Sequence, residues 1–570
     1  MHGLHVADII VLGGYLVGVA FIGIWAGRRI HLSADFFMPR RFGKLMMVMF
    51  SFGSGTHSDQ AVGVAAKSYM SGLSGIWYQW LWLPVTPFYW LIAPIMRRFR
   101  AITTANVFEA RYSLSVAMLY AFVGMLNLSV NIGIMLKGSS EVISASTGGL
   151  LSADLAIALM TVIFVLYGVA GGLAAAIVTD FIQGVLTIIF SFLLLPLILN
   201  AVGGMAGIHE AIADPAKLSL VAPEEIGVFY IAVIAFNGLV GIVVQPHTMG
   251  NCAAGRTEMD GRVGFMFGNL AKRVCTIPWA LTGLAAIVYF TQTNRVVEAD
   301  RVFGAVAGDF LPRILPGMLG IFIAALLASV MSSCDAFMIA SSALFTENLY
   351  RPLRPGRAER HYVTVGRIAA VGVVSGGVAF AYWLPGIVAG LEIFWKVSAM
   401  MGIAFWLGLF WRRMTVAGAW AATLTSFAAW IATSRIAFGE YVLWDFDSLV
   451  TPHLADFMVW GGALYLPWQM LFYLAAGLIG GVVVSLLTRP VPEGRLENFY
   501  ALIRTPVVPG EQVAIPCTLP QGATVPAKRT LLPGTGLEIP VPTAAGLTGF
   551  LIGWGCVGVL VLIVYAIAQT

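Results

Sequence analysis

One segment limits the fold of this chain more than any other, because it is apolar for long enough to cross a membrane and yet carries hydroxyls and a carboxylate. From Leu319 to Phe345 the only charged side chain is Asp335, and the other polar side chains are serines and one cysteine. A helix needs roughly 20 apolar residues to cross a hydrocarbon layer about 30 Å thick. The segment therefore predicts a membrane-spanning helix that carries a polar stripe.

The polar side chains of this segment recur at helical spacing. Ser329, Ser332 and Asp335 are three residues apart and Ser333 lies beside them, so they share one face of the helix. A carboxylate at the membrane centre costs about 2.5–3.5 kcal/mol on insertion scales and needs a partner, a cavity or an ion. Oxygen ligands alone suit a hard cation such as Na⁺. The alternative is that the serines only pack helices closely; the aspartate among them favours the cation.

The rest of the chain is apolar as well. Of its 570 residues, 59% are hydrophobic and 11% charged, and the mean hydropathy is +0.86. This composition predicts a polytopic, all-α membrane protein in contact with the lipid bilayer. The net charge of +5 comes from short loops between apolar runs and does not indicate nucleic-acid binding. The five cysteines show neither paired nor metal-ligand spacing. Nothing in the sequence requires a protein partner.

Apolar runs along the chain predict about fourteen spans. The first, Val6–Gly27, is followed rather than preceded by arginines, so it predicts an uncleaved helix instead of a signal peptide. Residues 489–545 contain ten prolines and predict an irregular linker without chemistry of its own. The predicted spans are residues 6–27, 45–66, 72–96, 115–146, 152–170, 173–201, 227–249, 262–290, 314–345, 362–383, 386–411, 416–436, 463–488 and 546–568.

The charges of the loops predict the orientation of these spans. Arginines and lysines follow spans one, three, nine and eleven, whereas the loops after spans six and twelve are rich in aspartate and glutamate. Basic loops face the cytoplasm. The chain is therefore expected in the cell membrane with both termini outside and with the linker 489–545 in the cytoplasm.

Two of the predicted spans are interrupted, and they lie five spans apart. Phe50–Gly63 places glycine, serine, threonine, histidine and aspartate inside an apolar run, and Ala235–Pro246 carries an asparagine, two glycines and a proline. Paired interruptions in two halves point to a transporter site in an inverted repeat, although glycines also allow tight helix crossing. We expect a leading helix and loop (1–44), a five-plus-five core with broken first and sixth helices (45–411), two accessory helices (412–488), the linker (489–545) and a last helix (546–570).

Several motifs resemble one known family. Ala325–Pro355 is similar to the eighth core helix and following loop of the sodium/solute symporter family, whose members include sugar, proline, sialate, pantothenate and iodide carriers. The resemblance covers about residues 6–490 and implies a LeuT-like fold and cation-coupled symport, with Na⁺ as the coupling ion and no enzymatic activity. The other matching motifs are Asp35–Lys44, Val107–Ser113, Tyr167–Gly184 and Leu407–Ala419.

The same resemblance implies a sodium site between the first broken helix and the eighth core helix. Asp180 matches an acidic residue near the sodium route. Asp335 stands where some members place a further serine, so it either strengthens the cation site or holds a proton, because burial raises the pKa of a carboxylate; coupling to H⁺ stays open. The implied ligands are backbone carbonyls of Gly53, Thr56 and Ser329 and hydroxyls of Ser332 and Ser333.

For the solute, the sugar-carrying branch of the family offers the most matches. Gln60, Asn237 and Lys272 match sugar-contacting positions, and Gln79 stands where that branch often has glutamate. Amides and a lysine hydrogen-bond hydroxyl groups without burying an unpaired carboxylate. The match fails at Val240, where an aromatic gate is expected, and at Leu391, where a glutamine is expected. A sugar or polyol is the favoured solute.

The alternatives are a small carboxylate or amino acid, coupled to Na⁺ or H⁺, and a non-transporting membrane sensor. Lys137 and Lys396 lie inside predicted spans and are candidate anchors for a carboxylate, but each has a glutamate one turn away, which makes a neutral i,i+4 pair the simpler interpretation. His57, beside the first interruption, is a candidate donor to the solute. No response domain follows residue 490, which disfavours the sensor.

Overall fold

The structure of the protein is a computed structural model that describes residues 5–27, 38, 40–222, 225–438, 441–511, 513 and 515–569. Within these ranges the side chains of residues 16, 19–20, 22–27, 58, 166–183, 332, 437–438 and 441 lie outside the description. Side-chain predictions for Asp180 and Ser332 therefore fall outside the described part.

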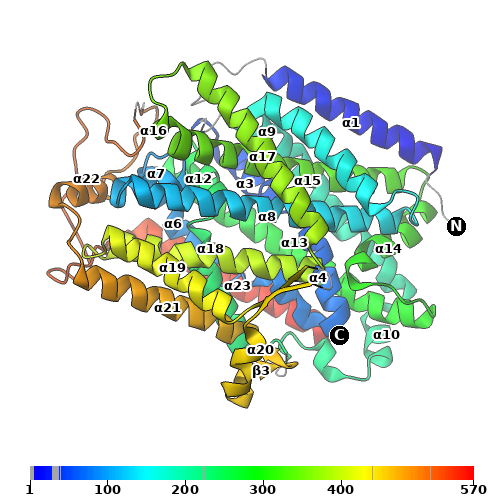
Figure 1. Cartoon of the computed structure of the whole chain (residues 1–570). Coiled ribbons are helices and arrows are strands. Elements are labelled where there is room, and N and C mark those ends of the chain that lie inside the picture. The colour runs from blue at the N-terminus through cyan, green and yellow to red at the C-terminus, as the bar shows by residue number, and fades with distance from the viewer. Residues whose placement is uncertain are drawn as a thin grey trace.

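The described chain is a bundle of helices (Figure 1). Eight helical segments are long and apolar enough to cross a membrane, and a ninth span results if one bent pair counts as a single crossing. The predicted number of fourteen spans stays a prediction, since several apolar helices are too short or interrupted. The eight segments are α8 (Leu114–Ser146), the Gly184–Ala201 part of α9, α13 (Glu258–Gln292), Met318–Leu353 with α15 (Met318–Ala343), α17 (Glu359–Trp383), α18 (Ile387–Phe410), α21 (Leu466–Leu487) and α23 (Ala544–Gln569).

Helix α9 (Ala153–Ala201) differs from the prediction of two spans at residues 152–170 and 173–201. It is one helix of 49 residues, more than twice the roughly 20 residues that one crossing needs, so the number of crossings it makes stays a prediction. The predicted boundary contains Gly171 and Gly172, yet glycine lowers helix propensity by only about 1 kcal/mol. In a membrane, a continuous helix also keeps every backbone group hydrogen-bonded. Two glycines alone therefore do not end a helix.

Both predicted helix interruptions are present. Helix α3 (Lys44–Gly53) ends where the glycine- and serine-rich stretch begins, and α4 (Ser58–Ser71) resumes after His57. Helix α11 (Val228–Ile242) is followed after three residues by α12 (Pro246–Ala253), and the two are bent by 71°. Proline at the start of α12 has no N–H to continue the preceding helix. The interruptions leave backbone carbonyls without helical partners.

Helix α13 packs closely against α3, and glycines make this possible. A Cβ atom added at Gly264 would lie 2.5 Å from the Cβ of Met47, and one at Gly268 would lie 2.5 Å from the carbonyl oxygen of Val48. Small residues let two helix backbones approach within a membrane. The contact holds α3, and hence the first interruption, against the first third of α13.

The linker 489–545 contains a helix that the sequence analysis did not predict. Helix α22 (Glu493–Arg504) buries Leu496, Phe499 and Tyr500, and Arg412 at the end of α18 pairs with Glu493, Glu497 and Glu538 from the linker. The linker folds into α22 because its apolar side chains pack against the helical bundle. The proline content of the linker does not reveal this contact. Two small hairpins, β1–β2 (Arg435–Phe438, Tyr441–Asp445) and β3–β4 (Val459–Trp460, Ala463–Leu464), lie in the loop between α19 (Val416–Ala432) and α21.

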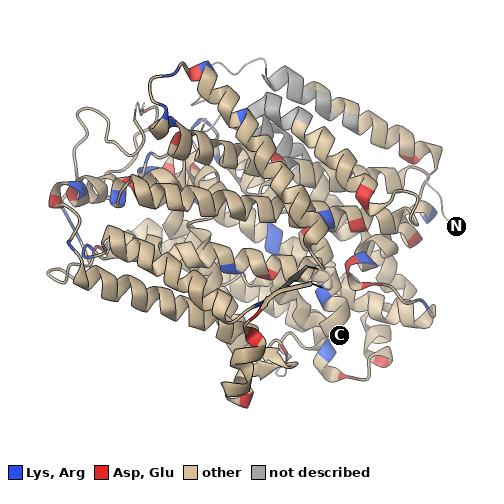
Figure 2. Ribbon diagram, viewed as in Figure 1, with Lys and Arg blue, Asp and Glu red and all other residues tan. Residues whose placement is uncertain are grey.

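Charged residues are concentrated at the ends of the bundle. Figure 2 shows lysine and arginine gathered around α22 and α7 (Thr104–Arg111), with few charges along the middle of the helices. Figure 1 shows both termini toward the end of the bundle opposite α22. A central belt with few charges is what a polytopic membrane protein requires.

Candidate functional site

Three backbone carbonyls at the first interruption accept hydrogen bonds from side chains of two other helices. Ser333 Oγ donates to the carbonyl of Gly53 at 3.3 Å, and Ser329 Oγ donates to the carbonyl of Thr56 at 3.0 Å. Lys272 Nζ, from α13, donates to the carbonyl of Gly55. The sequence predicted that the interruption would meet the serines of the Leu319–Phe345 segment, and the structure brings four of the predicted sodium ligands together here.

The donor set of this interruption fits a small hard cation. The Thr56 hydroxyl is buried, with a residue exposure of 1%, and has no hydrogen-bond partner among the described atoms. It adds to the carbonyls and serine hydroxyls, and neutral oxygen ligands of this type suit Na⁺ rather than a softer metal. Asp335 is buried on α15, the helix that carries Ser329 and Ser333, but it does not line the cavity described next.

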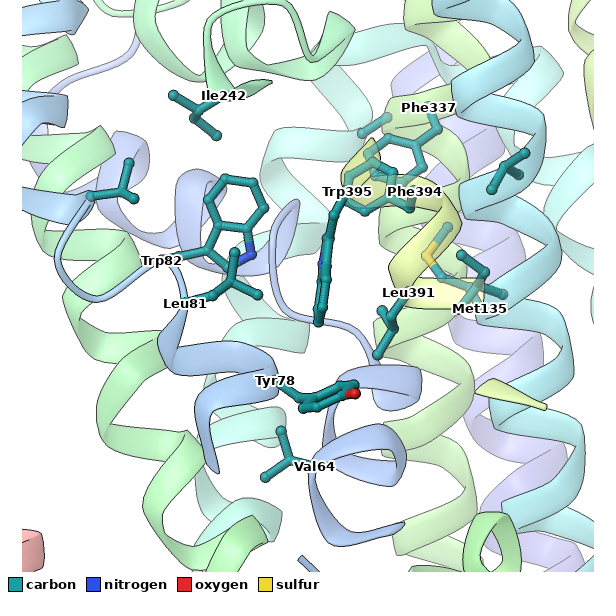
Figure 3. Packing of buried hydrophobic residues seen from close by; sticks show 14 of the residues in the cluster. Val64, Tyr78, Leu81, Trp82, Met135, Ile242, Phe337, Leu391, Phe394 and Trp395 are labelled. Atoms are coloured by element: carbon teal, nitrogen blue, oxygen red, sulfur yellow. The ribbon is translucent and has the colours of Figure 1, made fainter. Parts of the chain in front are cut away.

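A small central cavity of about 50 Å³ lies beside the interruption. The aromatic residues that line it are Trp82, Tyr89, Phe265, Phe337, Phe394 and Trp395. Figure 3 shows the Trp82 and Trp395 rings set apart from each other, with Tyr78 beneath them. The charged and polar lining of the cavity includes His57, Asp59, Gln60, Gln79, Lys272 and Arg273. More than half of the described lining residues are polar or charged. Convergent polar groups beside aromatic walls suit a small polar molecule.

Four of the predicted solute-binding residues line this cavity. Gln60 Nε2 lies 3.2 Å from His57 Nδ1, and the Gln60 side-chain oxygen has no partner among the described atoms. His57 Nδ1 also lies 3.0 Å from a carboxylate oxygen of Asp59, while its Nε2 has no partner among those atoms. The side-chain oxygen of Gln79 accepts a long hydrogen bond of 3.5 Å from the Arg273 guanidinium. Lys272 lines the cavity but its ammonium group is bound to Gly55.

The other three predicted solute-binding residues do not line the central cavity. Asn237 donates to the carbonyl of Trp395 at 3.1 Å and accepts a hydrogen bond from the Tyr473 hydroxyl, so its amide is occupied by protein groups. Lys137 pairs with Glu141 at 3.2 Å, as the simpler interpretation expected. In the described part of the chain Lys396 has no such pair.

Glu392, one turn before Lys396, accepts a hydrogen bond from the Tyr78 hydroxyl at 2.9 Å instead of pairing with that lysine. Tyr230 donates to the same Tyr78 hydroxyl at 3.3 Å. On the side of the bundle away from α22, Lys67 pairs with Glu225 at 2.5 Å, and the Tyr465 hydroxyl donates to the Glu225 carbonyl at 2.8 Å.

The sequence analysis missed Asp59 and Arg273 as lining residues. Asp59 stands inside the first interrupted segment, and Arg273 follows Lys272 in the middle of a predicted span. An arginine inside a span is a strong signal, because charged side chains at that depth are rare and functional.

Comparisons with known proteins point to one family. The model of the sodium:solute symporter family matches residues 36–426. Sodium/glucose cotransporter 1 of Oryctolagus cuniculus is 24% identical, with 88% of this chain and 82% of the relative covered. The osmoregulated proline transporter of Bacillus subtilis is 27% identical over 75% of this chain and 90% of the relative. The sodium/pantothenate symporter of Escherichia coli is 25% identical over 73% and 88%.

The solved structure of a Na⁺-coupled sialic acid symporter, in a substrate-bound outward-open state, has the same fold. Its TM-score is 0.69 at 18% sequence identity, with 86% of this chain and 99% of that chain covered. The family model spans well over half of the chain and includes the interrupted helix and the serine stripe. The protein therefore belongs to the sodium:solute symporter family, a family of multi-pass membrane transporters, and Na⁺ is its coupling ion.

Proposed function

We propose that the protein is a secondary active symporter that imports a small polar organic solute together with Na⁺. The observation that carries this proposal is the meeting of the first interruption with α15, where Ser329 and Ser333 bind carbonyls of Thr56 and Gly53. An unwound helix at membrane depth needs partners for its carbonyls, and a cation supplies them in transporters of this architecture. The cavity for the solute begins one residue away, at Gly55 and His57.

The proposed mechanism couples the two ligands through this interruption. Na⁺ bound between Gly53, Thr56, Ser329 and Ser333 holds α3 and α4 against α15 and thereby orders His57 and Gln60, which line the cavity. Solute binding to the same residues then raises Na⁺ affinity by the factor by which Na⁺ raises solute affinity, because linkage is reciprocal. Asp180, Ser332 and Asp335 remain proposed contributors to the cation site.

The nature of the solute follows from the cavity lining. Gln60 and Gln79 line the cavity as a sugar or polyol site requires, but the Asn237 amide is bound to Trp395 and Tyr473. A carboxylate or amino acid is the alternative class, and the lining contains two cations for it, Lys272 and Arg273. A sensor without transport is the remaining alternative. The loop charges support the orientation proposed from sequence, with α22 in the cytoplasm and both termini outside.

Uptake into proteoliposomes tests this proposal. A mixed pool of sugars, polyols, carboxylates and amino acids is offered under an inward Na⁺ gradient or an inward H⁺ gradient, and accumulated compounds are identified by mass spectrometry. Ser333→Ala is expected to raise the half-activating Na⁺ concentration about 10-fold or more, since hydrogen bonds and contacts to a charge contribute about 1.5–3 kcal/mol.

Ser341→Ala is the matched control, because Ser341 is buried on the same helix and its one hydrogen bond among the described residues is to the Met338 carbonyl of its own helix, at 2.8 Å. Accumulation driven by H⁺ alone would move the coupling role to Asp335 and Asp180. No accumulation by well-folded protein under either gradient would contradict transport.

A further inference from the structure

The guanidinium group of Arg273 lines the central cavity and has no acidic partner in the described part of the chain. It is 1% exposed in the middle of α13. Its two terminal nitrogens donate to neutral amide oxygens, of Gln79 and Asn269, both at 3.5 Å. The Tyr89 hydroxyl lies beside it, and its Nε has no partner among the described atoms. These are weak contacts for a permanently charged group.

Another buried arginine of the same chain shows what a structural arginine looks like here. Arg111 is 2% exposed, and its guanidinium donates to the carbonyls of Gly408 at 2.8 Å, Trp411 at 3.0 Å and Arg412 at 3.3 Å. Those carbonyls end a helix, and they carry the partial negative charge that a cation needs. Arg273 has no comparable set of close acceptors.

The charges that line the cavity do not balance. The lining contains the two basic side chains of Lys272 and Arg273, and Asp59 is the one carboxylate among the described lining residues. Asp59 already lies 3.0 Å from His57, so it does not serve Arg273. A buried cation without a counter-charge is strongly unfavourable, and bound Na⁺ would add to the excess. A ligand that carries a negative charge removes it.

We propose that the transported solute is a small organic anion whose carboxylate is bound by Arg273. This inference rests on the proposed function and selects among its solute classes. Guanidinium binds carboxylate through two parallel hydrogen bonds, and the long contacts to Gln79 and Asn269 leave these donors free to reorient. The aromatic walls, Trp82, Phe394 and Trp395, accept the uncharged remainder of the solute.

The test compares matched pairs of probes on purified full-length protein. D-gluconate is paired with sorbitol and L-lactate with lactamide, and pyruvate is the third carboxylate. Binding is followed by intrinsic tryptophan fluorescence, since Trp82 and Trp395 line the cavity, with and without Na⁺. At least one carboxylate is expected to bind in a Na⁺-dependent manner while its neutral analogue does not. This comparison uses the unmodified chain and does not depend on the folding of any variant.

Arg273→Gln is expected to weaken binding of that carboxylate roughly 10- to 100-fold, and Arg273→Lys to weaken it less, because the charge remains and the paired donors are lost. Arg262→Gln is the matched control on α13, since Arg262 lies against the Trp90 ring and away from the cavity. It should bind the carboxylate like the unmodified protein.

The Na⁺ response without solute separates the two hypotheses. A Na⁺-induced fluorescence change that is lost in Ser333→Ala supports the proposed function whatever the solute. With that response intact, binding of a neutral analogue as tight as its carboxylate, or failure of all three carboxylates to bind, overturns the inference alone. Absence of the Na⁺ response overturns the proposed function and the inference with it.

Discussion

Replacement of Gly268 by alanine tests whether the close contact between α13 and α3 sets the geometry of the sodium site. The new Cβ would lie 2.5 Å from the Val48 carbonyl oxygen, 2.9 Å from the Ser51 Cβ and 3.0 Å from the Phe52 backbone nitrogen. All three atoms belong to α3, and two of them are backbone. The helix must move away by about 0.5 Å at Val48 to restore even a tight contact of roughly 3.0 Å.

The expected cost is worked from two opposing terms. Overpacking a well-filled interface costs about 1–3 kcal/mol, and alanine gains up to about 1 kcal/mol over glycine in helix propensity. Gly372→Ala is the matched control, because a Cβ at Gly372 on α17 meets no atom within 4 Å, so only the propensity gain applies. Gly268→Ala should melt below the unmodified protein, and Gly372→Ala at or above it.

The same displacement should reach the cation site. Gly53 ends α3, and its carbonyl already lies 3.3 Å from Ser333 Oγ, near the limit of a hydrogen bond. Loss of a contact worth about 1 kcal/mol would raise the half-saturating Na⁺ concentration roughly fivefold. The assays are thermal unfolding in detergent and Na⁺ titration of tryptophan fluorescence. Equal melting temperatures and equal Na⁺ titrations for the two alanine variants would refute this reasoning.

Three further outcomes are expected. Glu538→Gln should speed hydrogen exchange of the linker backbone near residue 538, because the Arg412 guanidinium loses a 2.7 Å bond to a carboxylate that is 4% exposed; unchanged exchange would show that the linker is held otherwise. Hydrogen bonds from Arg412, with a smaller part from Arg504, lower the pKa of Glu497. Its stabilising contribution is therefore complete above the unfolded-state pKa of about 4.3 and lost as the pH falls through the lowered value. The protection of the α22 amides, relative to their intrinsic exchange rate at each pH, should therefore fall only below about pH 4.3, and a loss of protection already at pH 6 would contradict this. Asn237→Ala should lower the melting temperature with little change in solute affinity, and a large loss of affinity would return Asn237 to the solute site.

The sequence by itself determined the class of protein and the position of its two interruptions. Apolar runs long enough to span a membrane have few alternatives as folds, because only helices satisfy the backbone there. Glycine, serine and proline inside such a run then mark where the helix ends, as at Phe50–Gly63 and Ala235–Pro246. The serine stripe of 319–345 followed from helical periodicity, and its meeting with Gly53 and Thr56 followed from family resemblance.

Only the tertiary structure decided which polar groups serve the solute. Periodicity places a side chain on a face of its helix but does not reveal the helix that covers that face. Asn237 is covered by Tyr473, 236 residues further along the chain, and the linker folds as α22 because it meets the bundle. Arg273 was visible in the sequence as a charge inside a span. Whether Arg273 is a structural or a solute-binding residue depends on whether a neighbouring helix places an acidic side chain beside it. Only the packing of the helices decides that.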